Sequence, residues 1–192
     1  MNKKSFKLRK VIKILFTLFF SFFVIFLLSE ITLRFLPVTK GIQGQTVTVD
    51  QPVFRFEPNS EYMYSVGPLL LGANSGKINN YGFVNDADYE SQSSSPLLAI
   101  VGDSYIEAFM VPYANTLQGR LSQLTSNRVY SFGTSGAPLS QYLKFSRFAD
   151  EEFKPDCLII NVVGNDFDES LPEYKNSPGY HYFHSDVNGT LV

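Results

Sequence analysis

The densest hydrophobic pattern lies near the N-terminus, where positions 14–29 read ILFTLFFSFFVIFLLS without a charged residue. As a helix, this run covers about 24 Å, and apolar residues on both sides extend it toward the roughly 30 Å of a bilayer core. Pro37 ends the helix, because proline cannot continue the backbone hydrogen bonding. We therefore predict a transmembrane helix over 11–36.

A cleaved secretory signal peptide is the alternative to this anchor, because it also begins with basic residues. Its apolar core is shorter, however, and it ends in a pair of small residues that a peptidase recognises. The nearest such pair here, Leu27 and Ser29, is a poor match. We favour an uncleaved anchor in the cytoplasmic membrane, with the basic tail of 1–13 in the cytoplasm and the rest of the chain outside it.

Residues 37–95 show no sustained periodicity. Gly, Gln and Pro are frequent up to about residue 60, with one short alternating run from Thr46 to Val49. Turn dipeptides and a serine-rich tract at 90–95 follow. We expect an irregular lead-in, with an edge strand at most.

From residue 96 onward, apolar runs and helical periodicity alternate. Short apolar runs predict buried strands at 97–101, 129–132 and 157–163. Between them, apolar residues at helical spacing predict helices at 116–124 and 140–153. Alternation of this kind favours an α/β fold with a doubly wound parallel sheet, spanning 96–192.

Charge and composition narrow the classes of partner. Six of the 16 Lys and Arg lie in the first 13 positions and all 18 Asp and Glu follow position 29, so the remaining chain carries a net charge of −8. That balance excludes nucleic acid as the expected partner. A lone Cys157 and two histidines predict neither a disulfide framework nor a metal site. Cys157 lies in an apolar strand, where we expect an inert core residue.

Each predicted strand runs directly into a polar motif that contains glycine. The motifs are Gly102-Asp-Ser, Gly133-Thr-Ser-Gly and Gly164-Asn-Asp. In open parallel sheets, ligands bind at the carboxyl ends of the strands. The three motifs therefore predict a functional site at that edge.

In this order, the motifs resemble the conserved blocks of the SGNH (GDSL-like) hydrolases and acyltransferases. Residues 102–105 are similar to the first block, Gly136 to the second-block glycine and Asn165 to the third-block asparagine. The lead-in at 81–86 and the charged helix exit around Glu30 look like those of the membrane-anchored members. The resemblance implies a flavodoxin-like, three-layer α/β fold and a serine ester hydrolase or acyltransferase.

The resemblance also implies the roles of single residues. Ser104 would attack an ester carbonyl, and the Ser104 and Gly136 N–H groups with the Asn165 amide would form the oxyanion hole. Asp103 would support the turn without being the acid of the triad. No cofactor or metal is implied, and the substrate would be an acylated small molecule or polysaccharide, such as an acetyl ester on an envelope glycan.

Alternatives stay open at two of these positions. Gly133 is the other candidate for the second-block donor, or is needed only for the geometry of its turn. Asn165 is the other uncertain position, since Gly-Asn-Asp favours turns by composition alone.

The largest departure from the family concerns the base. The family carries an Asp-x-x-His motif near the end of its domain, but neither His181 nor His184 has Asp three positions before it. They lie in an alternating stretch at 179–185 that reads as a hairpin or a sheet edge, so we expect surface or packing roles. We expect a chain truncated before the motif, and weak activity or none.

Two other functions therefore remain. One is a catalytically inactive SGNH-like module that binds an acylated glycan or a partner enzyme at the membrane. The other is an anchored flavodoxin-like domain of unrelated function, for which the sequence offers no phosphate-binding motif or cofactor fingerprint.

Overall fold

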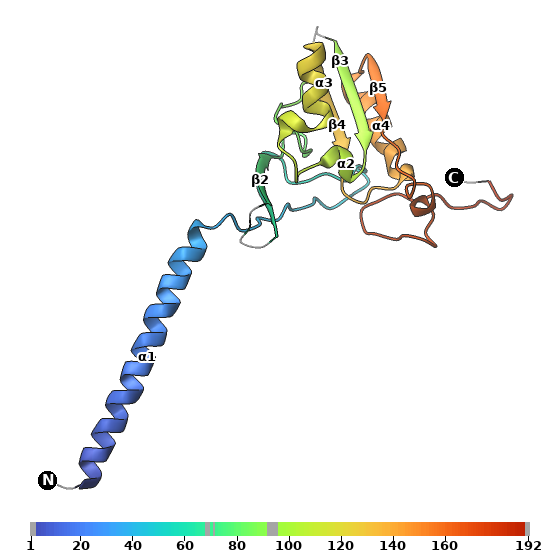
Figure 1. The fold of residues 1–192 in the computed structure, drawn as a ribbon. Helices are drawn as coiled ribbons and strands as arrows, with labels where there is room; N and C mark the ends of the chain where they lie inside the picture. The colour runs from blue at the N-terminus through green and yellow to red at the C-terminus, as the bar shows by residue number, and fades with distance from the viewer. Residues whose placement is uncertain (1–2, 68–69, 71, 92–95, 191–192) are drawn as a thin grey trace. The chain divides into compact units, whose positions relative to one another are not determined.

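The computed structural model describes residues 3–67, 70, 72–91 and 96–190 (Figure 1). Contacts divide the chain into two compact units, residues 1–38 and 39–192. Part of the expected serine-rich tract, at 92–95, lies outside the described residues.

The N-terminal unit is the helix α1 (Lys3–Phe35). Its 33 residues correspond to about 50 Å of helix, and the part from Arg9 to Phe35 is long and apolar enough to cross a membrane. The helix begins well before the predicted residue 11, because the basic tail continues the same helix. Near its end, Glu30 and Arg34 form an ion pair of 2.9 Å. Length and composition fit a single-pass anchor and a signal sequence alike.

The second unit contains a parallel sheet of β3 (Leu97–Gly102), β4 (Arg128–Gly133) and β5 (Cys157–Ile160). The strand order is β4-β3-β5, so the chain places one strand on each side of β3. All three strands were predicted from their apolar runs. β5 is shorter than the predicted 157–163, since pairing with β3 ends at Ile160.

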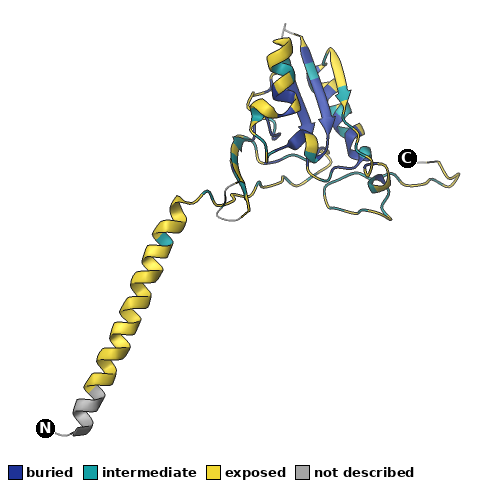
Figure 2. Ribbon diagram, in the orientation of Figure 1, coloured by how far each residue is buried: buried dark blue, intermediate teal, exposed yellow. Residues whose placement is uncertain are grey.

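Helices α3 (Leu117–Thr125) and α4 (Leu139–Phe153) cover opposite faces of this sheet. Side chains alternate along a strand, so that Ala99 and Val101 pack with α4, whereas Ile100 packs with Leu121 of α3. A third helix, α2 (Ser104–Glu107), follows β3 directly. The unit is therefore a mixed α/β structure with helices on both faces of a three-stranded parallel sheet (Figure 2).

The lead-in is more ordered than the sequence predicts. It forms an antiparallel hairpin of β1 (Glu61–Val66) and β2 (Gly72–Lys77). The expected edge strand at Thr46–Val49 is wrong, because that segment makes no strand pairing in the structure. The hairpin escaped prediction because β2 reads GANSGK, which has neither alternation nor β-branched residues.

Aromatic side chains from the lead-in complete the core on the α4 face. Phe83 is fully buried and packs edge-to-face on Phe132 of β4, with ring centroids 5.1 Å apart. Tyr89 stacks on Tyr130 at 3.9 Å. The lead-in is thus part of the same hydrophobic core as the sheet.

The outer edge of β4 is closed by two side chains of the lead-in. The Tyr89 hydroxyl donates to the Ser131 carbonyl oxygen (2.8 Å) and accepts from the Ser131 N–H (2.7 Å). The Asn85 amide donates to the Val129 carbonyl oxygen (3.2 Å). These side chains therefore occupy the positions at which a further strand would bond to β4.

We expect Tyr89→Phe to lower the free energy of unfolding by about 2 kcal/mol, because it leaves the buried N–H of Ser131 without its partner. Urea unfolding of the purified chain in detergent measures the change. Tyr174→Phe is the matched control, because that side chain is 69% exposed, and a change within about 0.5 kcal/mol is expected there. Equal stability of both variants would contradict the role of the hydroxyl.

At the opposite edge, β5 pairs only with β3 among the described residues. Cys157, expected in the core, is exposed, and Leu158 and Ile160 are also exposed. The expectation for Cys157 was wrong because a continuous apolar run does not distinguish a central strand from an uncovered edge strand.

Candidate functional site

The loop after β3 holds the first motif. The Asp103 carboxylate caps α2 by accepting from the Tyr105 N–H (3.0 Å), and it is buried. The two glycines at the strand ends allow close packing here. A Cβ at Gly102 would lie 2.4 Å from Ile106 Cγ1, and a Cβ at Gly133 would lie 3.0 Å from the backbone carbonyl oxygen of Asp103. Gly133 therefore has a packing reason of its own.

Ser104 is the first residue of α2 and is half-buried. It lies at the carboxyl end of β3, the strand at which the sheet order reverses, which is where ligands bind in such sheets. Its side chain lines a hollow of about 410 Å³ with four mostly apolar neighbours, Tyr105, Ala108, Met110 and Val111. Across the described chain, no hydrogen bond engages the Ser104 hydroxyl, which is therefore free to meet a ligand.

The loop after β4 contains Gly136, whose φ of +78° favours glycine over residues with a side chain. A Cβ at this position would lie 3.2 Å from Lys175 Nζ. The ammonium group of Lys175 therefore lies close to Gly136.

The loop after β5 contains Asn165, which is exposed. Its amide donates to Glu169 Oε1 (3.0 Å), and Glu169 in turn pairs with Lys175. Burial raises the pKa of Glu169, but the hydrogen bonds from Lys175 and Asn165 outweigh burial, and the pKa is lowered overall. These contacts link Asn165 through Glu169 and Lys175 to Gly136, so two of the three predicted oxyanion residues lie in one cluster.

Asp166, next to Asn165, shapes this loop. Its carboxylate accepts from the Tyr142 hydroxyl (2.9 Å) and from the Val163 N–H (2.6 Å). Burial raises the pKa of Asp166, and its second oxygen is buried without a hydrogen-bond partner in the structure. Because Asp166 makes the bonds that form the turn, the exposed Asn165 side chain is not needed for that purpose.

Neither of the two histidines makes a hydrogen bond to Ser104 in the described structure. His181 Nδ1 pairs with Gln141 Oε1 of α4 (3.0 Å), and its carbonyl oxygen accepts from Ser140 (2.7 Å). Burial, with a contribution from Lys144, lowers the pKa of His181. His184 is exposed. Residues 179–184 form no strand, Ser185 is a bridge residue and a turn follows at 186–190, whereas residues 191–192, on the far side of that turn, lie outside the described residues.

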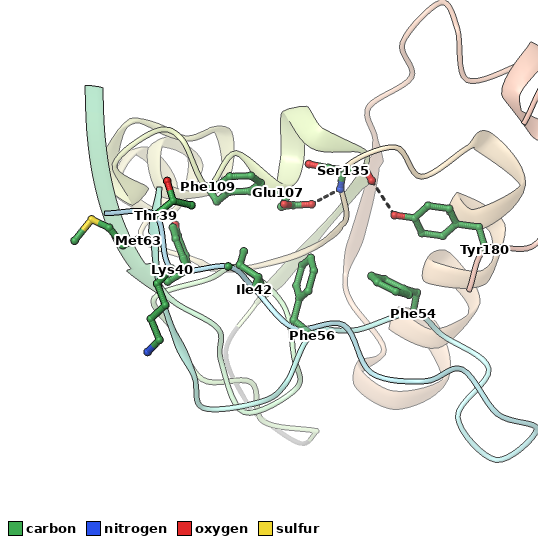
Figure 3. Close-up of a pocket in the computed structure, with 12 residues that line it drawn as sticks. Thr39, Lys40, Ile42, Phe54, Phe56, Met63, Glu107, Phe109, Ser135 and Tyr180 are labelled. Carbon is green, nitrogen blue, oxygen red and sulfur yellow. Dashed lines mark hydrogen bonds between the residues drawn. The ribbon is translucent and has the colours of Figure 1, made fainter. Parts of the chain in front are cut away.

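A second cavity contains a carboxylate that the sequence interpretation missed. Glu107 of α2 is 2% exposed and accepts a hydrogen bond from the Ser135 N–H (Figure 3). Burial raises the pKa of Glu107 to about 7, with Asp103 adding to the shift. The available signal was a single charge inside the apolar run of 106–111.

Comparison of the chain with protein-family models, with curated proteins and with solved structures gives no match.

Proposed function

We propose that the protein is a membrane-anchored serine ester hydrolase or O-acyltransferase of the SGNH type, with Ser104 as its nucleophile. The observation that carries the proposal is the position of Ser104. Ser104 follows β3, and β3 lies between β4 and β5, the strands that precede the Gly136 loop and the Asn165 loop. The proposed substrates are acetyl esters of small molecules or of envelope glycans outside the cytoplasmic membrane, with α1 as the anchor.

The proposed reaction has two steps. Ser104 Oγ attacks the ester carbonyl carbon as a base removes the hydroxyl proton, and the carbonyl oxygen becomes an oxyanion. The N–H groups of Ser104 and Gly136 stabilise that charge, together with the Asn165 amide once it leaves Glu169. The alcohol then departs with a proton and leaves an acyl-serine. Water releases the acid in hydrolysis, and an acceptor hydroxyl takes the acyl group in transfer.

A non-catalytic binding module is the second candidate, and two observations favour it. Neither His181 nor His184 bonds to Ser104, and the Asn165 amide is engaged by Glu169. A serine without a base is barely activated. Such a module would bind an acylated glycan or a partner enzyme at the membrane without turning it over.

Fluorophosphonate labelling of native membranes separates the two candidates, because the probe reacts with activated serines. We expect a labelled band that Ser104→Ala removes and Ser185→Ala, an exposed serine, retains. A band near 21.7 kDa would place the base within these residues, and a heavier band would place it in a longer natural chain. Absence of Ser104-dependent labelling at any mass would overturn the enzyme proposal in favour of the binding module.

A further inference from the structure

The cavity at Glu107 has a volume of about 290 Å³, close to the lower end of the roughly 300–1,000 Å³ typical of small-ligand pockets. Its lining comes from the lead-in, from α2 and the residues that follow it, from Ser135 in the loop after β4, and from the C-terminal segment (Figure 3). Every lining residue belongs to the second unit. Nothing in the proposed chemistry of Ser104 uses this cavity.

Five aromatic rings form much of its wall, namely Phe54, Phe56, Tyr62, Phe109 and Tyr180. Neighbouring rings meet edge to face, and Phe54 and Tyr180 do so at 62° with centroids 5.3 Å apart. Phe54 and Phe56 meet at 83° with centroids 5.7 Å apart, and Tyr62 and Phe109 meet at 76° and 6.0 Å. A pocket lined by several aromatic rings shares the composition of the aromatic cages that hold quaternary ammonium groups.

The charge of the cavity comes from Glu107. Its carboxylate faces the rings from above in the close-up, with one bond to the Ser135 N–H (Figure 3). No cation of the described chain pairs with it; Lys40 lines the same cavity, but its ammonium group points away from Glu107. The carboxylate is thus buried against aromatic rings without a countercharge, a costly arrangement that a bound cation would relieve.

We propose that this cavity binds an N-alkylated ammonium group, such as the trimethylammonium of choline, with Glu107 as its counter-ion and the aromatic rings as its cage. The methyl groups supply apolar contact, and the charge gains from both the carboxylate and the ring faces. The inference goes beyond the esterase proposal and does not depend on Ser104.

Binding should weaken as pH falls through about 7, because Glu107 then takes up a proton. The other titratable or charged groups near the carboxylate are Asp103 in the preceding turn, Tyr62 of β1, Tyr180 of the C-terminal segment and Lys40 of the lead-in. Burial raises the pKa of both tyrosines to about 12, so that they do not titrate in this range.

The test is calorimetric titration of the full chain in detergent at pH 8.5, with choline and with 3,3-dimethyl-1-butanol. The second ligand has the same shape but carries carbon in place of the charged nitrogen. We expect choline to bind about 30-fold more tightly, as a desolvated cation–π site of about 2 kcal/mol implies. Equal affinities, or no binding of choline, would overturn the proposal and leave Glu107 as an anchor for Ser135.

Variants locate the binding. Glu107→Gln keeps an acceptor for the Ser135 N–H, and should weaken choline at least about tenfold without affecting the neutral ligand. Phe56→Leu should weaken choline, and Glu173→Gln, which removes an exposed carboxylate, should have no effect. If Glu107→Gln does not fold, the comparison of the two ligands on the unaltered chain still tests whether the cavity prefers a cation.

Competition identifies the source of the ammonium group. Displacement of choline by soluble glycerophosphocholine would indicate a free solute, and displacement only by phosphatidylcholine vesicles would indicate a lipid headgroup. If neither glycerophosphocholine nor the vesicles displace choline, the cavity binds a small free ammonium ion. Each of these results supports the site.

Discussion

Provided that a base activates Ser104, as the enzyme proposal requires, replacing Ser104 by alanine should lower acetyl-ester hydrolysis by native membranes that carry the protein by on the order of 10⁴-fold or more. The Ser104 hydroxyl is the proposed nucleophile of the first step, so its loss removes the route through an acyl-serine. The fold should survive, because Asp103 caps α2 through the backbone N–H of Tyr105 and not through Ser104. Initial rates at matched protein levels, with membranes lacking the protein as blank, measure the effect.

Ser185→Ala is the control for that experiment and should keep its full rate, since residue 185 is exposed. A Ser104→Ala protein within about twofold of the unaltered rate would exclude Ser104 as the nucleophile. A rate already at background in the unaltered protein would instead favour the binding module.

Glu107→Gln should make the protein more stable at pH 8 by about 3 kcal/mol and leave its stability almost unchanged near pH 4.5. Burial raises the pKa of Glu107 from 4.5 to about 7, so the folded chain holds a proton that the unfolded chain has already released. The stabilisation from that proton is complete below pH 4.5, falls as pH rises, and is lost above about 7. Glutamine does not titrate and escapes the loss.

Urea unfolding in detergent, followed by tyrosine fluorescence at pH 4.5 and pH 8, measures this difference. Asp166 also has a raised pKa, but it is present in both proteins and cancels in the comparison. Parallel stability profiles for the two proteins would show that Glu107 is not desolvated as the structure indicates. Glu173→Gln should follow the unaltered protein at both pH values.

The sheet and its helices could be predicted because their signals are local. The apolar run of β3 and the helical spacing in α4 each specify one element, and the order of the elements implies parallel pairing. The hairpin β1–β2 could not be predicted in this way. It is stabilised by partners distant in the sequence, such as the bond from the Asn74 amide to the carbonyl oxygen of Phe109.

In the candidate site, too, local features could be predicted from the sequence and distant contacts could not. Ser104 comes two residues after β3 and Asn165 comes five residues after β5, so their placement beyond the carboxyl ends of these strands follows from the order of elements. The partners of Asn165 could not be predicted, because Glu169 is positioned by a 3₁₀ turn at Asp168–Ser170 and by Lys175. Glu107 was missed because the aromatic rings that line its cavity include those of Phe54 and Phe56, which lie about 50 residues earlier in the chain.

The two edges of the sheet differ in whether a further strand can pair with them. The hydroxyl of Tyr89 and the amide of Asn85 already take the outward-facing backbone groups of β4, whereas β5 presents exposed apolar side chains and an unpaired edge within the described structure. A further strand can therefore be added to this sheet only at the β5 edge, whether it comes from this chain or from another molecule. Of the two sheet edges, β5 is therefore the one open to aggregation, and Cys157 at its start is an exposed attachment point for a spin label that reports such pairing.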